Sequence, residues 1–236
     1  FVHCTADIEY LNAKKIHHNC NYEVLPNGIN LSIYSKKDRL YINKSSIPNH
    51  KFIFLFYGRL HPVKALETLL EAYDFARSSG MPDSQLLIVG SPYSSIYLEK
   101  LKFITSNLHF SSEIQFIPHV AKSNIPSLLS SVNVTLLTSY TENFGMSIVE
   151  SMASKKPVIV SRNVNISYLI KSANCGLVVE ISPEEIGRAM MKYRSSTDLC
   201  EAHSRNGYNY VRDNLSWELI VYKLNQLYDK YEINFS

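Results

Sequence analysis

The sequence has 236 residues, of which 45% are hydrophobic and 19% are charged, and its formal net charge at pH 7 is +3. This length is enough for one large hydrophobic core, or for one domain and part of another. The small net charge does not indicate binding to nucleic acid, and no apolar run approaches the ~20 residues of a membrane span. No signal peptide is recognisable at the start of the chain.

The cysteines do not predict a metal site. Cys4, Cys20, Cys175 and Cys200 are widely separated, and no two of them form a C-x-x-C pair. This usage is typical of reduced thiols in a cytoplasmic protein. We therefore expect a cytoplasmic protein, or one at the inner face of the membrane with at most peripheral association.

The first 50 residues give weak signals. Residues 1–20 show a helical pattern for which Thr5 is a suitable N-cap. Asn27–Gly28 is a turn signal, and residues 31–49 are polar and irregular, as in a surface connection.

A strand, a charged loop and a helix follow. The continuous apolar run 51–57 (KFIFLFY) predicts a buried strand, and leucines at helical spacing predict a helix over residues 65–77. Arg59 and Lys64 lie between them, at the carboxyl edge of the predicted strand. Two cations at this place could neutralise a diphosphate, although an isolated Arg and Lys would be ordinary surface residues.

Two further strands are predicted before the middle of the chain. The run 85–90 (QLLIVG) ends at Gly90, which either lets a ligand approach the backbone or only closes the strand. The run 113–118 (EIQFIP) is followed by His119 and Val120 at the same sheet edge. His119 is either close to a ligand or an exposed loop histidine.

The stretch 132–160 contains a strand, a polar loop, a short helix and a second strand, which is the pattern of a parallel crossover unit. Glu142 precedes the helix and Glu150 lies inside it, eight positions later. Eight residues at helical rise span about 12 Å. The helix N-terminus between the two carboxylates suits a phosphate, because its N–H groups are free and its dipole is positive there.

The remainder continues the alternation of strands and helices. A strand is predicted over 175–180, and helices are predicted over 166–172, 183–193, 199–214 and 217–231, the last with Ser216 as its N-cap. Strands that alternate with helices from residue 51 onward predict an α/β fold with a doubly wound, Rossmann-like parallel sheet.

The sequence resembles the group 1 (family 4) retaining glycosyltransferases of the GT-B fold, whose E-x7-E motif Glu142 and Glu150 match. The resemblance covers residues 25–231 and is strongest at 58–64 and 141–157. It implies that Arg59 and Lys64 stabilise the leaving diphosphate, that Glu142 orients the donor sugar, and that Glu150 binds the ribose. The further donor contacts that it implies come from Gly58, Gly90, His119, Val120, Asn143, Phe144, Gly145 and Met146.

The same resemblance implies a domain organisation. Residues 1–22 would be the tail of a mostly absent N-terminal acceptor domain together with the linker, and residues 23–236 would be the donor-binding domain. The helix 216–231 would cross back to the first domain. The sequence departs from the family pattern at Ala65, where a glycine is usual, and at 161–165, which lacks a Gly-rich turn and an acidic residue.

The function that the resemblance implies is transfer of a sugar from a nucleoside-diphosphate sugar to an acceptor hydroxyl in polysaccharide or glycoconjugate biosynthesis. The acceptor would be a glycan or a lipid-linked glycan, and neither metal nor cofactor would be needed. An alternative is a stand-alone nucleotide-sugar-binding subunit with a separate acceptor-binding partner. A dinucleotide-dependent oxidoreductase is disfavoured, because no G-x-G-x-x-G follows any predicted strand.

Overall fold

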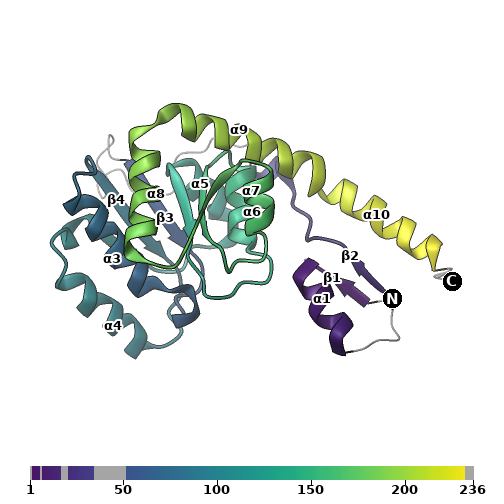
Figure 1. Ribbon diagram of the computed structural model, residues 1–236, viewed down its shortest axis with the longest axis horizontal. Coiled ribbons are helices and arrows are strands. Elements are labelled where there is room, and N and C mark those ends of the chain that lie inside the picture. The colour runs from purple at the N-terminus through teal and green to yellow at the C-terminus, as the bar shows by residue number, and fades with distance from the viewer. Residues whose placement is uncertain (1, 6, 17–20, 35–51, 232–236) are drawn as a thin grey trace.

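The computed structural model describes residues 2–5, 7–16, 21–34 and 52–231, which form a large α/β unit and a small unit beside helix α10 (Trp217–Lys230) (Figure 1). The large unit is built on a six-stranded parallel sheet. Its strands are β3 (Phe52–Tyr57), β4 (Ser84–Val89), β5 (Ile114–Ile117), β6 (Val134–Leu137), β7 (Val158–Ser161) and β8 (Gly176–Val179). These strands confirm the predicted doubly wound sheet.

The strand order in the sheet is β5-β4-β3-β6-β7-β8. The chain builds outward from β3 to the edge at β5, returns to the other side of β3 with β6, and continues outward to β8. The direction of winding therefore reverses between β3 and β6. In open parallel sheets, the crevice at such a reversal, outside the carboxyl ends of the strands, is where ligands bind.

Both faces of the sheet are buried. The side chains of β3 alternate between two hydrophobic clusters. Phe54 and Phe56 pack with helix α3 (Leu66–Ser78), and Leu55 and Tyr57 pack with helix α5 (Ile125–Ser130). A continuous apolar run is expected for a strand that is covered on both sides. The helices of this unit are α3 (Leu66–Ser78), α4 (Ser95–Ser106), α5 (Ile125–Ser130), α6 (Met146–Ala153), α7 (Ser167–Ser172), α8 (Pro183–Ser195) and α9 (Thr197–Asn214).

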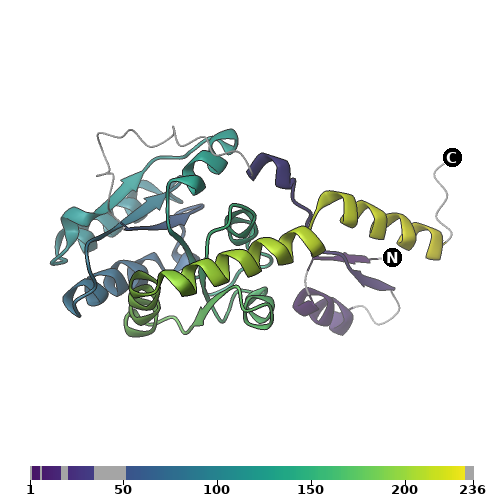
Figure 2. The same cartoon turned by 90° about the horizontal axis from the view of Figure 1, so that it is seen from above.

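Helices α9 and α10 (Trp217–Lys230) carry the chain from the sheet unit to the small unit (Figure 2). Ser216 caps α10 as predicted, because its hydroxyl accepts a hydrogen bond from the Leu219 N–H at 3.3 Å. Ile29 and Ser216 form a parallel bridge where α9 ends, so the chain enters and leaves the sheet unit at neighbouring points.

The small unit consists of β1 (Val2–Cys4), α1 (Asp7–Ile16) and β2 (Tyr22–Val24), and its two strands are parallel. The helix was predicted, whereas the two strands were not. The expected domain boundary after residue 22 falls within β2. Glu23 joins this unit to the end of α10, because its Oε1 accepts hydrogen bonds from Lys230 Nζ at 2.5 Å and Tyr231 OH at 2.9 Å.

The predicted surface connection 31–49 begins with the short helix α2 (Leu31–Tyr34), and its remainder lies outside the described residues. Within the part of the chain that the structure describes, none of the helices has the length and apolar character needed to cross a bilayer.

Candidate functional site

Two glycines shape the sheet edge where the site was predicted. Gly58 follows β3 and donates its N–H to Val89 O at 3.0 Å, and Gly90 follows β4 and donates to Ile117 O at 3.1 Å. A Cβ atom on Gly90 would lie 1.8 Å from the carbonyl oxygen of Gly58. Gly90 is therefore needed for the close approach of these two backbones, which is a packing role distinct from direct ligand contact.

The loop after Gly58 presents the two predicted cations. Arg59 is exposed, and no ion pair joins it to any residue that the structure describes. Lys64 ends a 3-10 turn, Pro62–Lys64, which is capped by His61, whose Nδ1 accepts a hydrogen bond from the Val63 N–H at 3.1 Å. The next residue, Ala65, adopts a left-handed conformation with φ 48° and ψ 44°. The tight turn that the family pattern makes with glycine is thus made here with alanine.

Lys64 reaches across the sheet edge to Glu142. Its Nζ forms an ion pair with Glu142 Oε2, although the two residues are 78 positions apart in the sequence. The side chains are 15% and 24% exposed, so both remain accessible from solvent. The predicted phosphate-binding cation and the predicted sugar-binding carboxylate are therefore direct neighbours.

The backbone around Glu142 is braced by the loop after β7. Glu142 and Val164 form a parallel bridge, and the Asn165 N–H donates to Glu142 O at 3.1 Å. Asn143 is exposed and lies between two units, since its side chain is 3.2 Å from Thr5 Oγ1 and 3.3 Å from Asn165 Nδ2. The loop that departs from the family pattern thus positions the Glu142 backbone instead of supplying an acidic side chain.

The turn into α6 exposes backbone more than side chains. Phe144 is buried in the main core, and Met146 is partly buried against it. Gly145 has φ 72°, and no side chain within the described residues caps the helix that it precedes. Because the first N–H groups of a helix have no intrahelical acceptor, this N-terminus can bind an anion.

Glu150 lies on α6 and contacts two tyrosines. Its Oε2 is 2.8 Å from the hydroxyl of Tyr57, the last residue of β3. Burial and the neighbouring Glu150 carboxylate raise the pKa of Tyr57 well above its ordinary value. Burial, then the charge of Glu150 and a hydrogen bond to it, also raise the pKa of Tyr34. Both phenols therefore stay protonated at neutral pH and can donate to the carboxylate.

The end of β5 supplies the outer part of this edge. His119 is exposed, whereas Val120 is 3% exposed and packs in the second hydrophobic cluster with Tyr57 and Val89. Only the backbone of Val120 is thus placed to contact a ligand, which is the kind of contact that the resemblance implies.

The arrangement combines the groups that a sugar diphosphate requires. Lys64, Arg59 and the N-terminus of α6 provide positive charge for an anion, and Glu142 and Glu150 provide acceptors for hydroxyl groups. All of them lie after the carboxyl ends of β3 and β6, at the reversal in strand order. The tyrosines beside Glu150 were not predicted, although a tyrosine directly before Gly58-Arg59 was a possible signal.

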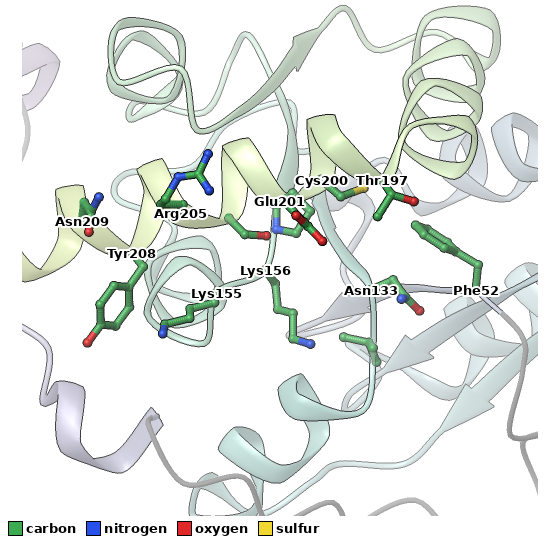
Figure 3. A pocket seen from close by; sticks show the side chains of 13 residues that line it. Phe52, Asn133, Lys155, Lys156, Thr197, Cys200, Glu201, Arg205, Tyr208 and Asn209 are labelled. Carbon is green, nitrogen blue, oxygen red and sulfur yellow. The ribbon is translucent and has the colours of Figure 1, made fainter.

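A separate cavity of about 740 Å³ lies at the opposite edge of the sheet, where β3, β6 and β7 begin (Figure 3). In it, the ammonium group of Lys155 lies 4.6 Å from the ring centroid of Tyr208. None of the predicted site residues lines it. Its lining consists of Phe52, Val132, Asn133, Lys155, Lys156, Pro157, Thr197, Cys200, Glu201, Ser204, Arg205, Tyr208 and Asn209.

Comparison with known proteins assigns the family. The sequence profile described as "Glycosyl transferases group 1" matches residues 37–210. This chain belongs to the group 1 glycosyl transferases. A curated relative in this group, the D-inositol 3-phosphate glycosyltransferase of Rhodococcus erythropolis (strain PR4 / NBRC 100887), is 25% identical over 221 residues, which are 91% of this chain and 49% of the relative. The chain thus spans about half the length of that relative.

Solved structures of glycosyltransferases share the fold. Sucrose-phosphate synthase from Thermosynechococcus elongatus has a TM-score of 0.82 at 23% identity, covering 98% of this chain and 58% of the synthase chain. Anabaena HepE, solved in complex with UDP-glucose, has a TM-score of 0.81 at 17% identity, covering 98% of this chain and 64% of the HepE chain. These likenesses show that the described part of this group 1 member shares the fold of the matching part of GT-B glycosyltransferases.

Proposed function

We propose that this chain is the donor-binding half of a glycosyltransferase that moves a sugar from a nucleoside-diphosphate sugar to an acceptor hydroxyl. The observation that carries the proposal is the ion pair between Lys64 and Glu142 at the reversal between β3 and β6, with Glu150 on the helix that follows. A cation and two carboxylates at this place match the charges and hydroxyls of such a donor. The crystal structure of HepE was solved in complex with UDP-glucose, which supports a nucleotide sugar as the class of ligand.

In the proposed reaction, the bond between the anomeric carbon and the diphosphate oxygen breaks. A new bond forms from that carbon to the acceptor oxygen, which loses its proton. Negative charge grows on the leaving diphosphate, and Arg59, Lys64 and the amides at the start of α6 stabilise it electrostatically. The proposal assigns this role to protein groups and not to a metal or a cofactor, and it takes retention of configuration from the family resemblance.

The ion pair also suggests what happens when the donor binds. The diphosphate takes Lys64 as its partner, and Glu142 is released to accept hydrogen bonds from hydroxyls of the sugar. A charged partner is exchanged for another charged partner, so neither side chain is left unpaired at a partly buried site. Glu142 thus becomes available to the sugar when the diphosphate has engaged Lys64.

The acceptor, a glycan or a lipid-linked glycan, would bind mainly to an N-terminal domain preceding the small unit. The site of action would be the cytoplasm, or the inner face of the membrane with peripheral association. We expect the 236-residue chain alone to bind the donor but to turn over poorly. Robust sugar transfer by this chain alone would contradict that expectation. Full activity after addition of a separate acceptor-binding protein would favour the alternative, in which this chain is a nucleotide-sugar-binding subunit.

Calorimetric titration with UDP, GDP, ADP and NAD tests the proposal. We expect one nucleoside diphosphate to bind, and its affinity to fall at least about tenfold in Glu150→Ala and in Arg59→Ala/Lys64→Ala, because each variant removes a charged partner of the ligand. Binding should persist in excess EDTA.

The matched controls are Glu184→Ala and Lys102→Ala/Lys171→Ala, which remove equal charge from exposed positions on other helices. These controls should bind like the wild type. Equal losses in the site variants and the controls would show that net charge alone is responsible and would contradict the site assignment.

A further inference from the structure

The hydroxyl of Tyr57 lies between two oxygen atoms of helix α6. It is 2.8 Å from Glu150 Oε2 and 2.7 Å from the carbonyl oxygen of Ser147. A phenol carries one proton, so it donates fully to only one of these acceptors at a time. The buried end of β3 is therefore tied to α6 at the turn that carries Glu150.

The Tyr57 side chain cannot move freely. It is 7% exposed and packs in the second hydrophobic cluster, whose members include Leu55, Val120 and Leu128. Tyr34 approaches from α2, packs against both clusters and hydrogen-bonds to the same carboxylate. Two phenols from different elements thus surround a carboxylate that is itself only half-buried.

We propose that Tyr57, assisted by Tyr34, is a positioning residue that fixes the Glu150 carboxylate so that it presents an oxygen to the ribose hydroxyls of a nucleoside diphosphate. This inference rests on the proposed function, in which Glu150 binds the ribose. A carboxylate has two oxygens and about four acceptor sites. Because the Tyr57 hydroxyl is hydrogen-bonded to Oε2, the carboxylate is held in one orientation and keeps acceptor sites for the ligand.

Such a role has a consequence for selectivity. A free glutamate on a helix surface must lose side-chain entropy when it binds a hydroxyl pair, whereas a glutamate that is already held does not. The preference for ribose over 2′-deoxyribose should therefore depend on Tyr57, although Tyr57 itself does not touch the nucleotide. A purely structural role would alter both affinities equally.

The test is calorimetric titration of the 236-residue chain and of Tyr57→Phe with UDP, GDP, ADP and their 2′-deoxy counterparts. We expect the wild type to bind one ribonucleotide more tightly than its 2′-deoxy form. Tyr57→Phe should weaken the ribonucleotide about tenfold and leave the deoxynucleotide within about twofold, since the lost contact acts through the ribose. In the Glu150→Gln background, Tyr57→Phe should add no further loss.

A matched control is Tyr73→Phe, which removes another tyrosine–glutamate hydrogen bond, the one of 2.9 Å to Glu113 Oε2 near the start of β5. It should leave both affinities unchanged. Circular dichroism melting checks that each variant is folded, and Tyr34→Phe repeats the test if Tyr57→Phe does not fold.

The outcomes separate the two proposals. Equal weakening of the ribo and deoxy forms, or no weakening of either, would overturn the positioning role while leaving nucleotide binding intact. If the folded wild type binds none of the three ribonucleotides, the proposed function itself fails, and the inference that rests on it fails as well.

Discussion

At the scale of single residues, the site edge depends on Gly90, whose neighbours leave no space for a side chain. Gly58 and Gly90 have φ values of 150° and 152°, and the missing side chain of Gly90 is what lets the loops after β3 and β4 lie against each other. This contact places the start of the Arg59 loop. The position of the cations that we propose to bind phosphate is therefore determined partly by a residue that carries no charge.

We expect Gly90→Ala to lower the free energy of unfolding by at least about 3 kcal/mol, because backbone strain and a steric clash add. The matched control is Gly80→Ala. Gly80 also has a positive φ, of 91°, but a Cβ there meets no atom within 4 Å. That variant should lose only about 1 kcal/mol. Urea denaturation measures both, and similar losses would show that the contact with Gly58 is unimportant.

At the scale of elements, the strands of the sheet were predictable because they are apolar on both faces and are separated by helices with clear spacing. The strands β1 and β2 were not, since three residues each give no periodicity and their pairing joins segments about twenty positions apart. The location of Arg59, Lys64 and Glu142 at the sheet edge was predictable from their place after strands. Tyr57 was missed because its hydroxyl partner is 93 positions away, and Val120 gave no sign that its side chain is in the core.

The contact between α8 and α9 predicts a pH dependence of stability. His203 on α9 is buried, and its Nδ1 is 2.7 Å from the Tyr193 hydroxyl on α8. Burial, and secondarily Lys192, lower the pKa of His203. The folded state therefore holds this imidazole neutral while the unfolded state binds a proton below pH ~6.5, so stability falls as the pH decreases through that value.

We expect His203→Gln to reduce the loss of stability between pH 6.5 and 5.5, because glutamine does not titrate. Urea denaturation at several pH values measures the slope. His109→Gln is the control, since it replaces an exposed histidine outside the contact between α8 and α9. Parallel stability profiles for the wild type and His203→Gln would contradict the prediction.

At the scale of the whole molecule, the two units meet where residues 27–29 lie against the start of α10. A Cβ on Gly28 would lie 2.6 Å from the ring of Trp217, the single tryptophan of the chain. Gly28 was predicted only as part of a turn. The structure shows that its lack of a side chain is also required by the helix that links the two units.

We expect Gly28→Ala to displace the Trp217 ring, shift its fluorescence emission to longer wavelength and speed hydrogen exchange in the first turns of α10. The sheet unit should keep most of its own protection, because its strands are held by the large buried core of β3, β4 and β6. Asn27→Ala is the neighbouring control. Unchanged emission and exchange in Gly28→Ala would show that the ring accommodates a methyl group without moving.

The paired backbone at this junction has a mechanical consequence. The Ile29 N–H donates to Leu215 O at 2.8 Å, and the Trp217 N–H donates to Ile29 O at 3.2 Å, so two passes of the chain cross between the units side by side. Units that are joined by one strand can twist freely, whereas twisting here would shear both hydrogen bonds. Bending about an axis that passes through both crossing segments leaves these two bonds intact. We therefore expect the two units to bend relative to each other in one direction more easily than they twist.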